Sequence, residues 1–356
     1  MILQIVNNIQ GHYEIIESII VKHQIIIGKY NITKINLEVN DCDKSFKIYI
    51  KKKYPHIEFK LSPIFNFYID CTVYPKQVEI IKLYDPKKYF FISHDIDMFI
   101  KQLPNVYFLT PLAKRFLYAD VMPHMTKKNM NKTYPIYVVQ GHYGGIHSKR
   151  RNLDLLLKIL EHDFKKKYLI KFVGRGEIPE EFKKHKDRIK FIQDLDFNNY
   201  HQQFNDCYAM FSLTLKETNP QYYKTKLTST INYIRGYKLK GIIDEELQNI
   251  YKLPDVQTYT SKNDIVRAFT ITLNDFYINY VFKNKNQKET NQKETNQQET
   301  NQKETNQQET NQKETNQQET NQQETNQQET NQKETNQQET NQQETKEETK
   351  QEIKIK

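Results

Sequence analysis

Short apolar runs alternate with amphipathic stretches along most of the first 285 residues. The clearest unit extends from Tyr134 to Leu247. YPIYVVQG ends in a glycine and precedes a basic cluster and leucines at helical spacing, and YLIKFVGRG is a second apolar run that ends in a glycine pair. Strands that alternate with helices predict a parallel sheet covered by helices. Such sheets bind ligands at the carboxyl ends of their strands, where these glycines and basic residues fall.

The N-terminal part repeats the alternation. ILQIV predicts a strand, and a glycine-containing turn and an amphipathic helix over IIESIIVKH follow it. Further strands are expected at residues 35–39, 46–50, 65–73 and 87–95, and a helix at residues 113–120. A polar, basic stretch after Pro123 has no apolar periodicity and predicts a linker. We therefore expect two α/β domains over residues 1–125 and 134–282, joined by a linker over 126–133.

The C-terminal segment has a different character. Residues 286–345 are twelve uninterrupted copies of N-Q-[K/Q]-E-T, which contain no apolar residue and so cannot offset the entropy of ordering. A five-residue period advances each copy by about 140° around a helix, so even a helical tail would show no continuous stripe. We expect residues 286–356 to be a disordered spacer, or at most a lone transient helix. A stacking Gln/Asn-rich segment is the weaker alternative because every copy carries a glutamate.

The tail hides the charge of the rest of the chain. The whole sequence has a net charge of +9, but residues 286–356 hold 9 lysines and 15 glutamates. Residues 1–285 therefore keep 44 basic and 29 acidic residues, a net charge of +15. This excess favours anionic partners such as nucleotide sugars, nucleic acid or an acidic membrane surface. The alternative is AT-rich coding bias, in which many of the lysines are solvated surface.

The number of cysteines and the length of the apolar runs indicate the cellular compartment of the protein. The three cysteines, Cys42, Cys71 and Cys207, are widely spaced and match neither a disulfide framework nor a zinc site. The N-terminus lacks a basic region ahead of an apolar core, and charges interrupt the apolar runs well short of the ~18 residues that a membrane span needs. We expect a soluble, cytoplasmic protein that has no transmembrane segment and no metal site.

Several motifs carry a family resemblance by their order. QG is followed by SKRRNLDLL, FVGRG, RIKFIQDLDFNNY, YAMFSLTLKETNPQYY, TKLTSTI and GIIDEEL, and FLTP…RFLYADVMP precedes the linker. This series resembles the GT-B glycosyltransferases of the group 1, family 4-like type. The residue pattern of the sequence is similar to that of glycosyltransferases of giant DNA viruses that infect amoebae. The resemblance covers roughly residues 85–275, and each motif is weak by itself.

The resemblance implies an α/β fold of two Rossmann-like domains in tandem with a cleft between them. It implies transfer of a sugar from a nucleotide-diphosphate donor to an unknown glycan, protein or lipid acceptor, with no required metal and no further cofactor. In a virus the protein would act in the host cytoplasm.

The residues expected to bind the donor lie in turns after strands and at a helix start. Guanidinium groups at a helix N-terminus match phosphate oxygens, and glycines let the backbone approach a ligand. A solvated helix start and plain strand-to-helix turns are the alternatives. The predicted donor-binding residues are Gly141, Lys149, Arg150, Arg151, Gly174, Arg175, Gly176, Lys226, Thr228 and Ser229.

One segment departs from the family pattern. Many retaining members carry two glutamates eight positions apart; Glu217 fills the first place, but the second is Thr225. Lys226, Thr228 and Ser229 instead offer a cation and hydroxyls at a helix start, which suits a phosphate or carboxylate on the donor. An ordinary N-cap is the alternative. We expect Arg150, Gly174 and Lys226 to surround one pocket.

His12 follows the first strand and is a candidate general base, because imidazole titrates near neutral pH. His94 and Asp95 end another predicted strand and are comparable candidates. Asp95 and Asp97 also match the D-x-D metal motif of GT-A transferases, but residues 41–43 and 194–196 match it equally. A GT-A enzyme would not need the second α/β domain.

Two other function classes stay open. The missing second glutamate allows a catalytically inactive GT-B-like protein that binds or scaffolds. The net charge of +15 allows a nucleic-acid-binding protein, but the lysines are scattered and no recognised nucleic-acid-binding motif is present.

Overall fold

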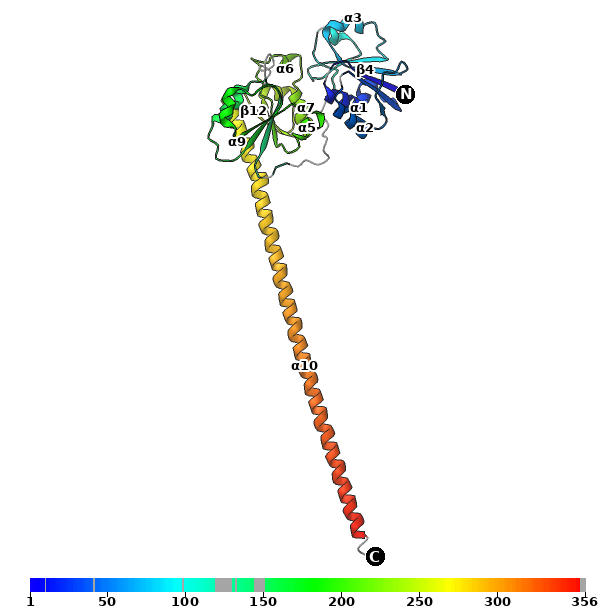
Figure 1. The fold of residues 1–356 in the computed structure, drawn as a ribbon, viewed down its shortest axis with the longest axis vertical. Coiled ribbons are helices and arrows are strands. Elements are labelled where there is room, and N and C mark those ends of the chain that lie inside the picture. Colours follow the sequence, from blue (N-terminus) through cyan, green and yellow to red (C-terminus); the bar gives the residue numbers. More distant parts are fainter. Residues whose placement is uncertain are drawn as a thin grey trace. The chain divides into compact units, whose positions relative to one another are not determined.

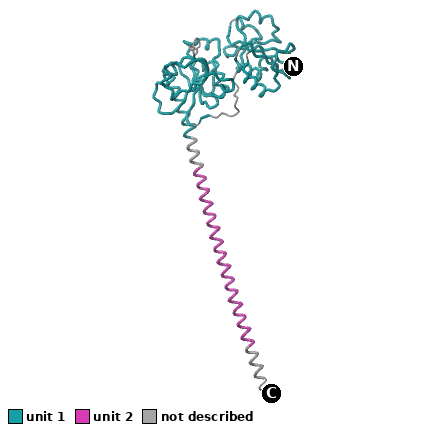
Figure 2. The backbone as a smooth tube through the Cα atoms, in the orientation of Figure 1, with its two compact units in different colours: residues 1–283 teal, residues 284–356 magenta. Residues whose placement is uncertain are grey.

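The computed structural model describes residues 1–9, 11–40, 42–97, 99–118, 130–131, 133–143 and 151–352, with the backbone alone at 283–291 and 343–352. The chain divides into two units, residues 1–283 and residues 284–356 (Figure 2). Most of the predicted linker over residues 126–133 lies outside the described residues.

Residues 1–118, here called the N-lobe, form a six-stranded parallel sheet with strand order β3-β2-β1-β4-β5-β6. The sequence predicted most of these strands as alternating or continuous apolar runs. The strands are β1 (Ile2–Asn7), β2 (Lys34–Val39), β3 (Ile57–Glu58), β4 (Phe67–Val73), β5 (Tyr89–Ser93) and β6 (Val106–Phe108).

Residues 130–283, the C-lobe, form a second six-stranded parallel sheet in the order β12-β11-β10-β7-β8-β9. The strands are β7 (Ile136–His142), β8 (Leu169–Arg175), β9 (Ile189–Gln193), β10 (Ala209–Phe211), β11 (Lys240–Asp244) and β12 (Val256–Tyr259). When the strands are counted within each lobe, both sheets have the order 3-2-1-4-5-6. This is the doubly wound arrangement, in which ligands bind where the strand order reverses. That place lies between β1 and β4 and between β7 and β10. The predicted α/β class is confirmed.

The N-lobe helices correct two predictions. The helices are α1 (Tyr13–Ile27), α2 (Lys44–Lys53) and α3 (Val78–Ile81), with short 3₁₀ turns at Pro75–Gln77 and Ile100–Gln102 (Figure 1). Residues 46–50 were expected to form a strand but belong to α2. Phe46 and Ile50 lie four residues apart and are both buried, and Asp43 Oδ1 accepts hydrogen bonds from the backbone of Ser45 and Phe46. The helix cap and helical spacing outweigh the β-forming residue types.

The predicted helix over residues 113–120 is also wrong for the part that is described. Residues 113–118 form no helix, and Phe116 instead makes a parallel bridge with Phe108. Arg115 donates from Nε to the Val106 carbonyl at 3.1 Å, which ties the segment back to β6. A tertiary hydrogen bond thus replaces the local helical pattern.

The C-lobe helices are α4 (Leu153–Glu161), α5 (Phe197–Gln202), α6 (Gln221–Lys224), α7 (Ser229–Tyr237), α8 (Glu245–Tyr251) and α9 (Asp264–Phe276), with a 3₁₀ turn at Glu180–His185. Helix α9 packs against α4 and β12, and a π-helical turn at Tyr277–Phe282 follows it.

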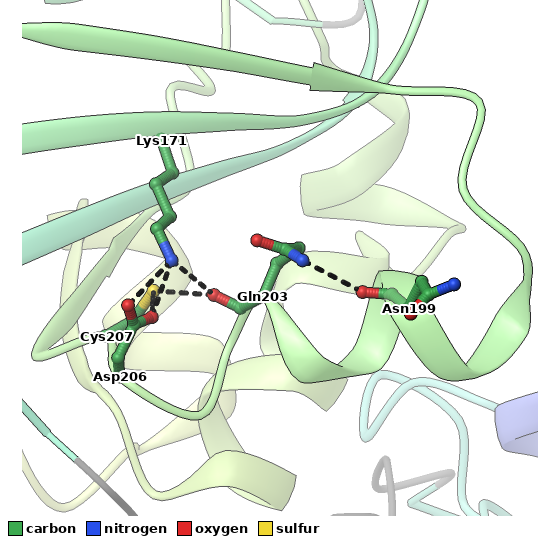
Figure 3. A network of polar contacts seen from close by, with 5 residues as sticks. All are labelled: Lys171, Asn199, Gln203, Asp206 and Cys207. Carbon is green, nitrogen blue, oxygen red and sulfur yellow. Dashed lines mark hydrogen bonds and ion pairs between the residues drawn. The ribbon is translucent and has the colours of Figure 1, made fainter.

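An ion pair between a buried lysine and a half-buried aspartate holds α5 against the C-lobe sheet (Figure 3). Lys171 on β8 is 6% exposed, and its ammonium contacts both carboxylate oxygens of Asp206 at 2.6 and 2.8 Å. The same ammonium donates to the Gln203 carbonyl at the C-terminal end of α5. A cation at this end complements the helix dipole. The contact therefore fixes the position of α5, which carries Tyr200.

The two lobes contact each other through specific groups. Phe197 of α5 belongs to the N-lobe core, with its ring 4.9 Å from that of Phe46. The backbone N–H of Phe197 donates to Asp43 Oδ2 at 3.3 Å. Thr110 of the N-lobe and Tyr251 of α8 share a hydroxyl hydrogen bond of 3.1 Å. These contacts bring the carboxyl ends of the two sheets into one region.

Residues 283–352 form a single helix, α10 (Lys283–Glu352), and the prediction of a disordered tail is not confirmed. The side chains of residues 292–342 are exposed, as a five-residue period requires. In each repeat from 296 to 340 the threonine hydroxyl donates to the carbonyl of the asparagine four residues before it, as in Thr300 to Asn296 at 2.9 Å. Backbone hydrogen bonds and the good helix propensity of Gln, Glu and Lys form this helix without tertiary packing.

The ends of β7 and β8 approach too closely for side chains. Gly141 pairs with Gly174, and a Cβ added to Gly174 would overlap the Gly141 carbonyl oxygen. We predict that Gly174→Ala lowers the free energy of unfolding by about 3 kcal/mol or more in urea titrations, because the backbone itself must move. Gly11→Ala is the matched control. Gly11 also has a positive φ, but an added Cβ would meet open space. We therefore expect Gly11→Ala to lower the free energy of unfolding by only about 1 kcal/mol. Equal losses in the two variants would contradict the steric account.

Candidate functional site

Two adjacent cavities lie between the lobes. Cavity A has a volume of about 440 Å³ and is lined by His12, Asp43, Arg175, Tyr200 and Tyr233 among others. Cavity B has a volume of about 620 Å³, and its lining includes His12, His94, Lys226, Ser229 and Asn232. His12 and Glu14 line both cavities. The cavities lie at the carboxyl ends of both sheets, where a doubly wound fold binds its ligands.

His12 occupies the N-cap position of α1 in a left-handed conformation, with φ 56°. Asn7, at the end of β1, donates from Nδ2 to the carbonyls of Ile9 and Gly11 at 2.7 and 3.0 Å, which fixes the loop before His12. The His12 ring meets the His94 ring edge-on, with centroids 4.3 Å apart. His12 Nδ1 lies 3.9 Å from a Glu14 carboxylate oxygen. The imidazole is therefore held at the junction of the two cavities.

His94 stays neutral in this environment. Burial, the neighbouring His12 and the cation of Lys226 lower the pKa of His94 to about 3, although a hydrogen bond to the Cys71 carbonyl opposes the shift. In β4, burial raises the pKa of Asp70 to about 6 despite hydrogen bonds from Thr72 N–H and from the amide of Asn8. The N-lobe side of cavity B thus presents a neutral imidazole.

Asp95 is engaged by the opposite lobe. Its Oδ2 lies 3.1 Å from Lys226 Nζ, and the two residues also form an antiparallel backbone bridge. The next residue, Ile96, donates its N–H to the Thr225 carbonyl at 2.9 Å. Asp95 therefore joins the two lobes and orients Lys226 at cavity B.

The N-terminus of α7 reaches cavity B. Thr228 occupies the N-cap position, but its hydroxyl makes no capping hydrogen bond to the helix, which disfavours the ordinary N-cap alternative. Thr228 Oγ1 and Asn232 Oδ1 are buried and have no hydrogen-bond partner among the described residues. Buried polar atoms normally have partners. Of these two residues, Asn232 lines cavity B, so its unpartnered Oδ1 lies beside the space that a polar ligand would occupy.

Arg151 lies against the same turn of α7. Its side chain is 7% exposed, and Nη2 donates to Thr230 Oγ1 at 3.1 Å. Arg151 was expected to open a helix, but α4 begins at Leu153 with Asn152 as its N-cap. A Cβ on Gly141 would lie 3.8 Å from the guanidinium. A cation and the positive end of a helix dipole therefore lie side by side here, and both favour an anion nearby.

A directed chain of hydrogen bonds connects cavity A to cavity B. The hydroxyl of Tyr233 donates to that of Tyr200, and Tyr200 donates to Gln140 Oε1 at 3.2 Å. Gln140 Nε2 then donates to Ser229 Oγ at 2.8 Å. Because Ser229 accepts from Gln140, its own O–H is directed to a partner other than the amide. The chain presents Ser229 as a hydrogen-bond donor at cavity B.

The remaining predicted residues fall in different places. Gly174 and Arg175 line cavity A. The carbonyl of Gly176 accepts a hydrogen bond from Gln193. Lys149 and Arg150 lie outside the described residues.

Glu217 does not join the His12 group. It is exposed and lines a third cavity of about 630 Å³ within the C-lobe, which Arg151 and Lys262 also line. Gly174 and Lys226, expected around one pocket, line cavities A and B respectively. The shared pocket is thus two neighbouring cavities that meet at His12 and Glu14.

The two carboxylates of the Asp95 and Asp97 match are engaged separately. Asp95 is paired with Lys226, and Asp97 Oδ1 accepts the backbone N–H of Phe99 at 2.8 Å. Within the described ranges, no group of three or more His, Cys, Asp or Glu side chains is placed to hold a metal ion.

Sequence reasoning missed Gln140, Tyr200 and Asn232. Gln140 had a signal, since it is the one polar residue in the apolar run before Gly141 and is 5% exposed in the structure. Tyr200 and Asn232 had none, because only the packing of α5 and α7 brings them to the cavities.

Comparisons with known proteins add little to this geometry. No protein-family model matches the chain. A dynein heavy chain-like protein 2 of Plasmodium falciparum (isolate 3D7) is 22% identical over 278 residues, which is 72% of this chain and 5% of that protein. Among the described residues, no helix combines the length and the apolar character needed to cross a membrane.

Several solved structures are similar over most of the chain. The lipopolysaccharide outer core galactosyltransferase WaaB in its apo form has a TM-score of 0.42 and 12% identity over 77% of this chain and 91% of its own. Sucrose-phosphate synthase from Thermosynechococcus elongatus has a TM-score of 0.45 and 10% identity over 78% and 90%. A putative UDP-N-acetylglucosamine 2-epimerase from Listeria monocytogenes has a TM-score of 0.45 and 7% identity over 77% and 88%. At these TM-scores the functional assignment depends on the site geometry.

Proposed function

We propose that the chain is a glycosyltransferase of the GT-B type that binds a nucleotide-diphosphate sugar between its lobes and transfers the sugar without a metal ion. The observation that carries the proposal is the first turn of α7. Its hydroxyls, the buried guanidinium of Arg151 and the ammonium of Lys226 surround one helix N-terminus at the carboxyl edge of a doubly wound sheet. The doubled 3-2-1-4-5-6 strand order supports the two-domain form of this fold.

In this proposal the diphosphate binds at the N-terminus of α7. Ser229 donates its O–H to a phosphate oxygen, and Lys226 supplies a positive charge. Because departure of the nucleoside diphosphate builds negative charge on these oxygens, preorganised donors stabilise the transition state more than the ground state. The N-lobe would supply the acceptor side of the cleft, and a glycan, protein or lipid acceptor is compatible with it.

His12 is the proposed general base. It lies at the junction of the cavities, and its neighbour His94 is neutral and so does not add a second positive charge when His12 takes a proton. Asp95 is not proposed as a base because it is paired with Lys226. Glu217, in the third cavity, is the only glutamate of the family 4-like pair that this chain retains, and the stereochemical outcome depends on its role.

A catalytically inactive binding protein of the same fold is the second candidate. Thr225 replaces the second glutamate of the family pattern, and its carbonyl is occupied by Ile96 N–H in a contact between lobes. Such a protein would bind a nucleotide but would not release sugar from the donor. Hydrolysis of UDP- or GDP-sugars, measured by free nucleotide, separates the two candidates.

Nucleotide binding is the first prediction. We expect UDP or GDP to bind the full chain in isothermal titration calorimetry, and Ser229→Ala to weaken binding by roughly tenfold to a hundredfold, as loss of a hydrogen bond to a charged group does. Lys183→Ala, an exposed lysine on the 3₁₀ turn of the C-lobe, is the control and should leave binding unchanged. No binding of either nucleotide by the folded wild type would contradict the proposal.

The hydrogen-bond chain predicts coupling between distant side chains. Tyr200→Phe removes the donor to Gln140, and Tyr200 itself lines cavity A and not cavity B. We expect it to weaken nucleotide binding severalfold in the wild-type background and to have a smaller effect when Ser229 is already alanine. Additive effects in this double-mutant cycle would show that the chain does not orient Ser229.

The pH dependence of stability tests the neutral state of His94. Folded His94 has a pKa of about 3, whereas an unfolded histidine titrates near 6.5, so below about pH 6.5 the unfolded state binds a proton that the folded state does not. Above pH 6.5 His94 is neutral in both states and does not lower the free energy of unfolding. Below pH 6.5 protonation of the unfolded state lowers that free energy by about 1.4 kcal/mol per pH unit. We expect His94→Gln to remove this loss between pH 6.5 and 4.5 in urea titrations.

The titration of Asp70 changes the free energy of unfolding with pH in the opposite direction. The effect of His94 is therefore measured as the difference between His94→Gln and the wild type. Its folded pKa of about 6 lies above the usual 3.9, so its contribution to stability falls as the pH rises from about 4 to 6. Asp70→Asn should therefore steepen the acid loss of the wild type. Parallel pH profiles for wild type and His94→Gln would contradict the assignment.

A further inference from the structure

The outer face of α2 carries a concentration of positive charge that the proposed function does not use. Five of the sixteen Lys and Arg residues of residues 1–118 lie in this ten-residue helix, and the helix contains no Asp or Glu. Lys53 is paired with the buried Glu17 at 2.8 Å. The other four lysines, at positions 44, 47, 51 and 52, are exposed.

The same face exposes an aliphatic side chain. Phe46 and Ile50 are buried against the N-lobe core, whereas Ile48 is 65% exposed and lies between lysines at helical spacing. Lys44, Lys47 and Lys51 are three and four residues apart, so they form one row along the helix. The face is therefore basic at its edges and apolar in the middle.

A neighbouring loop extends the apolar part. The ammonium groups of Lys47 and Lys51 lie 5.2 and 6.0 Å from the centre of the Phe59 ring. Leu61 and Ile64 follow Phe59 in the same loop and are 59% and 73% exposed. Two exposed aliphatic side chains thus follow the ring that the lysine row contacts.

We propose that α2 and the loop 59–66 form a docking surface for an anionic lipid membrane. Lysines attract acidic headgroups and keep their charge in water while their stems and the adjacent aliphatic side chains enter the interface. The surface begins directly after Cys42 and Asp43, which line cavity A. Docking here would hold the N-lobe side of the cleft next to the membrane.

The exposed side chains favour a lipid over a nucleic acid. Single-stranded nucleic acids bind where exposed aromatic or guanidinium groups stack on bases. The α2 face offers lysine and isoleucine, and the ring of Phe59 faces the two ammonium groups. Aliphatic side chains gain nothing from a phosphate backbone, whereas an acyl layer accepts them.

Sedimentation of the full chain with vesicles tests the proposal. We expect binding to vesicles of phosphatidylcholine mixed with phosphatidylserine and none to phosphatidylcholine alone. Lys47→Gln combined with Lys51→Gln should lower the partition coefficient tenfold or more. Lys183→Gln combined with Lys184→Gln removes the same charge from the C-lobe and should change it less than twofold. Ile48→Asn, which leaves the charge unchanged, should lower it severalfold.

Three outcomes would overturn the proposal. These are absence of binding by the folded wild type, equal losses in the two lysine variants, and tighter binding to DNA with no effect of Ile48→Asn. Circular dichroism of each variant excludes unfolding as the cause of a loss. Nucleotide titration of the same samples keeps this test separate from the proposed function, because the α2 surface and the α7 site lie in different lobes.

Discussion

The positive end of α7 and the groups that hold it are the constraint on which the rest of the site depends. A helix N-terminus presents backbone donors and a partial positive charge, and here a buried arginine reinforces that charge instead of opposing it. Gln140 and Arg151 each hold a hydroxyl of the first turn, so the turn has little freedom to adjust. The turn thus presents preorganised donors beside Lys226, whose position is fixed by its ion pair with Asp95. Donors of this kind suit an oxyanion, which is why the proposal centres on a diphosphate.

The fold places this turn opposite the N-lobe. Both sheets reverse their strand order once, and the two cavities at the carboxyl ends of the sheets meet at His12 and Glu14. The contact between Asp95 and Lys226 and the insertion of Phe197 into the N-lobe core join the lobes on either side of the cavities. Movement of one lobe would therefore disturb the contact between Asp95 and Lys226.

The sequence predicted the regular parts of the fold well. The apolar runs from Ile2, from Lys34 and from Ile136 are buried strands, because parallel strands covered on both faces need continuous apolar residues. It failed where two patterns compete. FKIYI has strand-forming residues, yet the Asp43 cap and burial four residues apart make it helical. In residues 113–118, hydrogen bonds from Arg115 to distant carbonyls outweigh a local helical pattern.

The candidate site was predictable only in its local parts. Glycines at strand ends and hydroxyls at a helix start are local signals, and they predicted Gly174 and Ser229, which line cavities A and B. Gln140, Tyr200 and Asn232 act through tertiary contacts between α5, β7 and α7, which no spacing in the chain encodes. Glu217 had the expected local position but lines a different cavity, because the loop between β10 and α6 directs it away from His12.

A high-resolution structure of the full chain with UDP or GDP bound tests the central claim most directly. We predict density for the diphosphate at the first turn of α7, with a phosphate oxygen within hydrogen-bond distance of Ser229 Oγ and the base and ribose in the adjoining cavities. A nucleotide bound elsewhere on the molecule, with the first turn of α7 occupied only by water, would contradict the account.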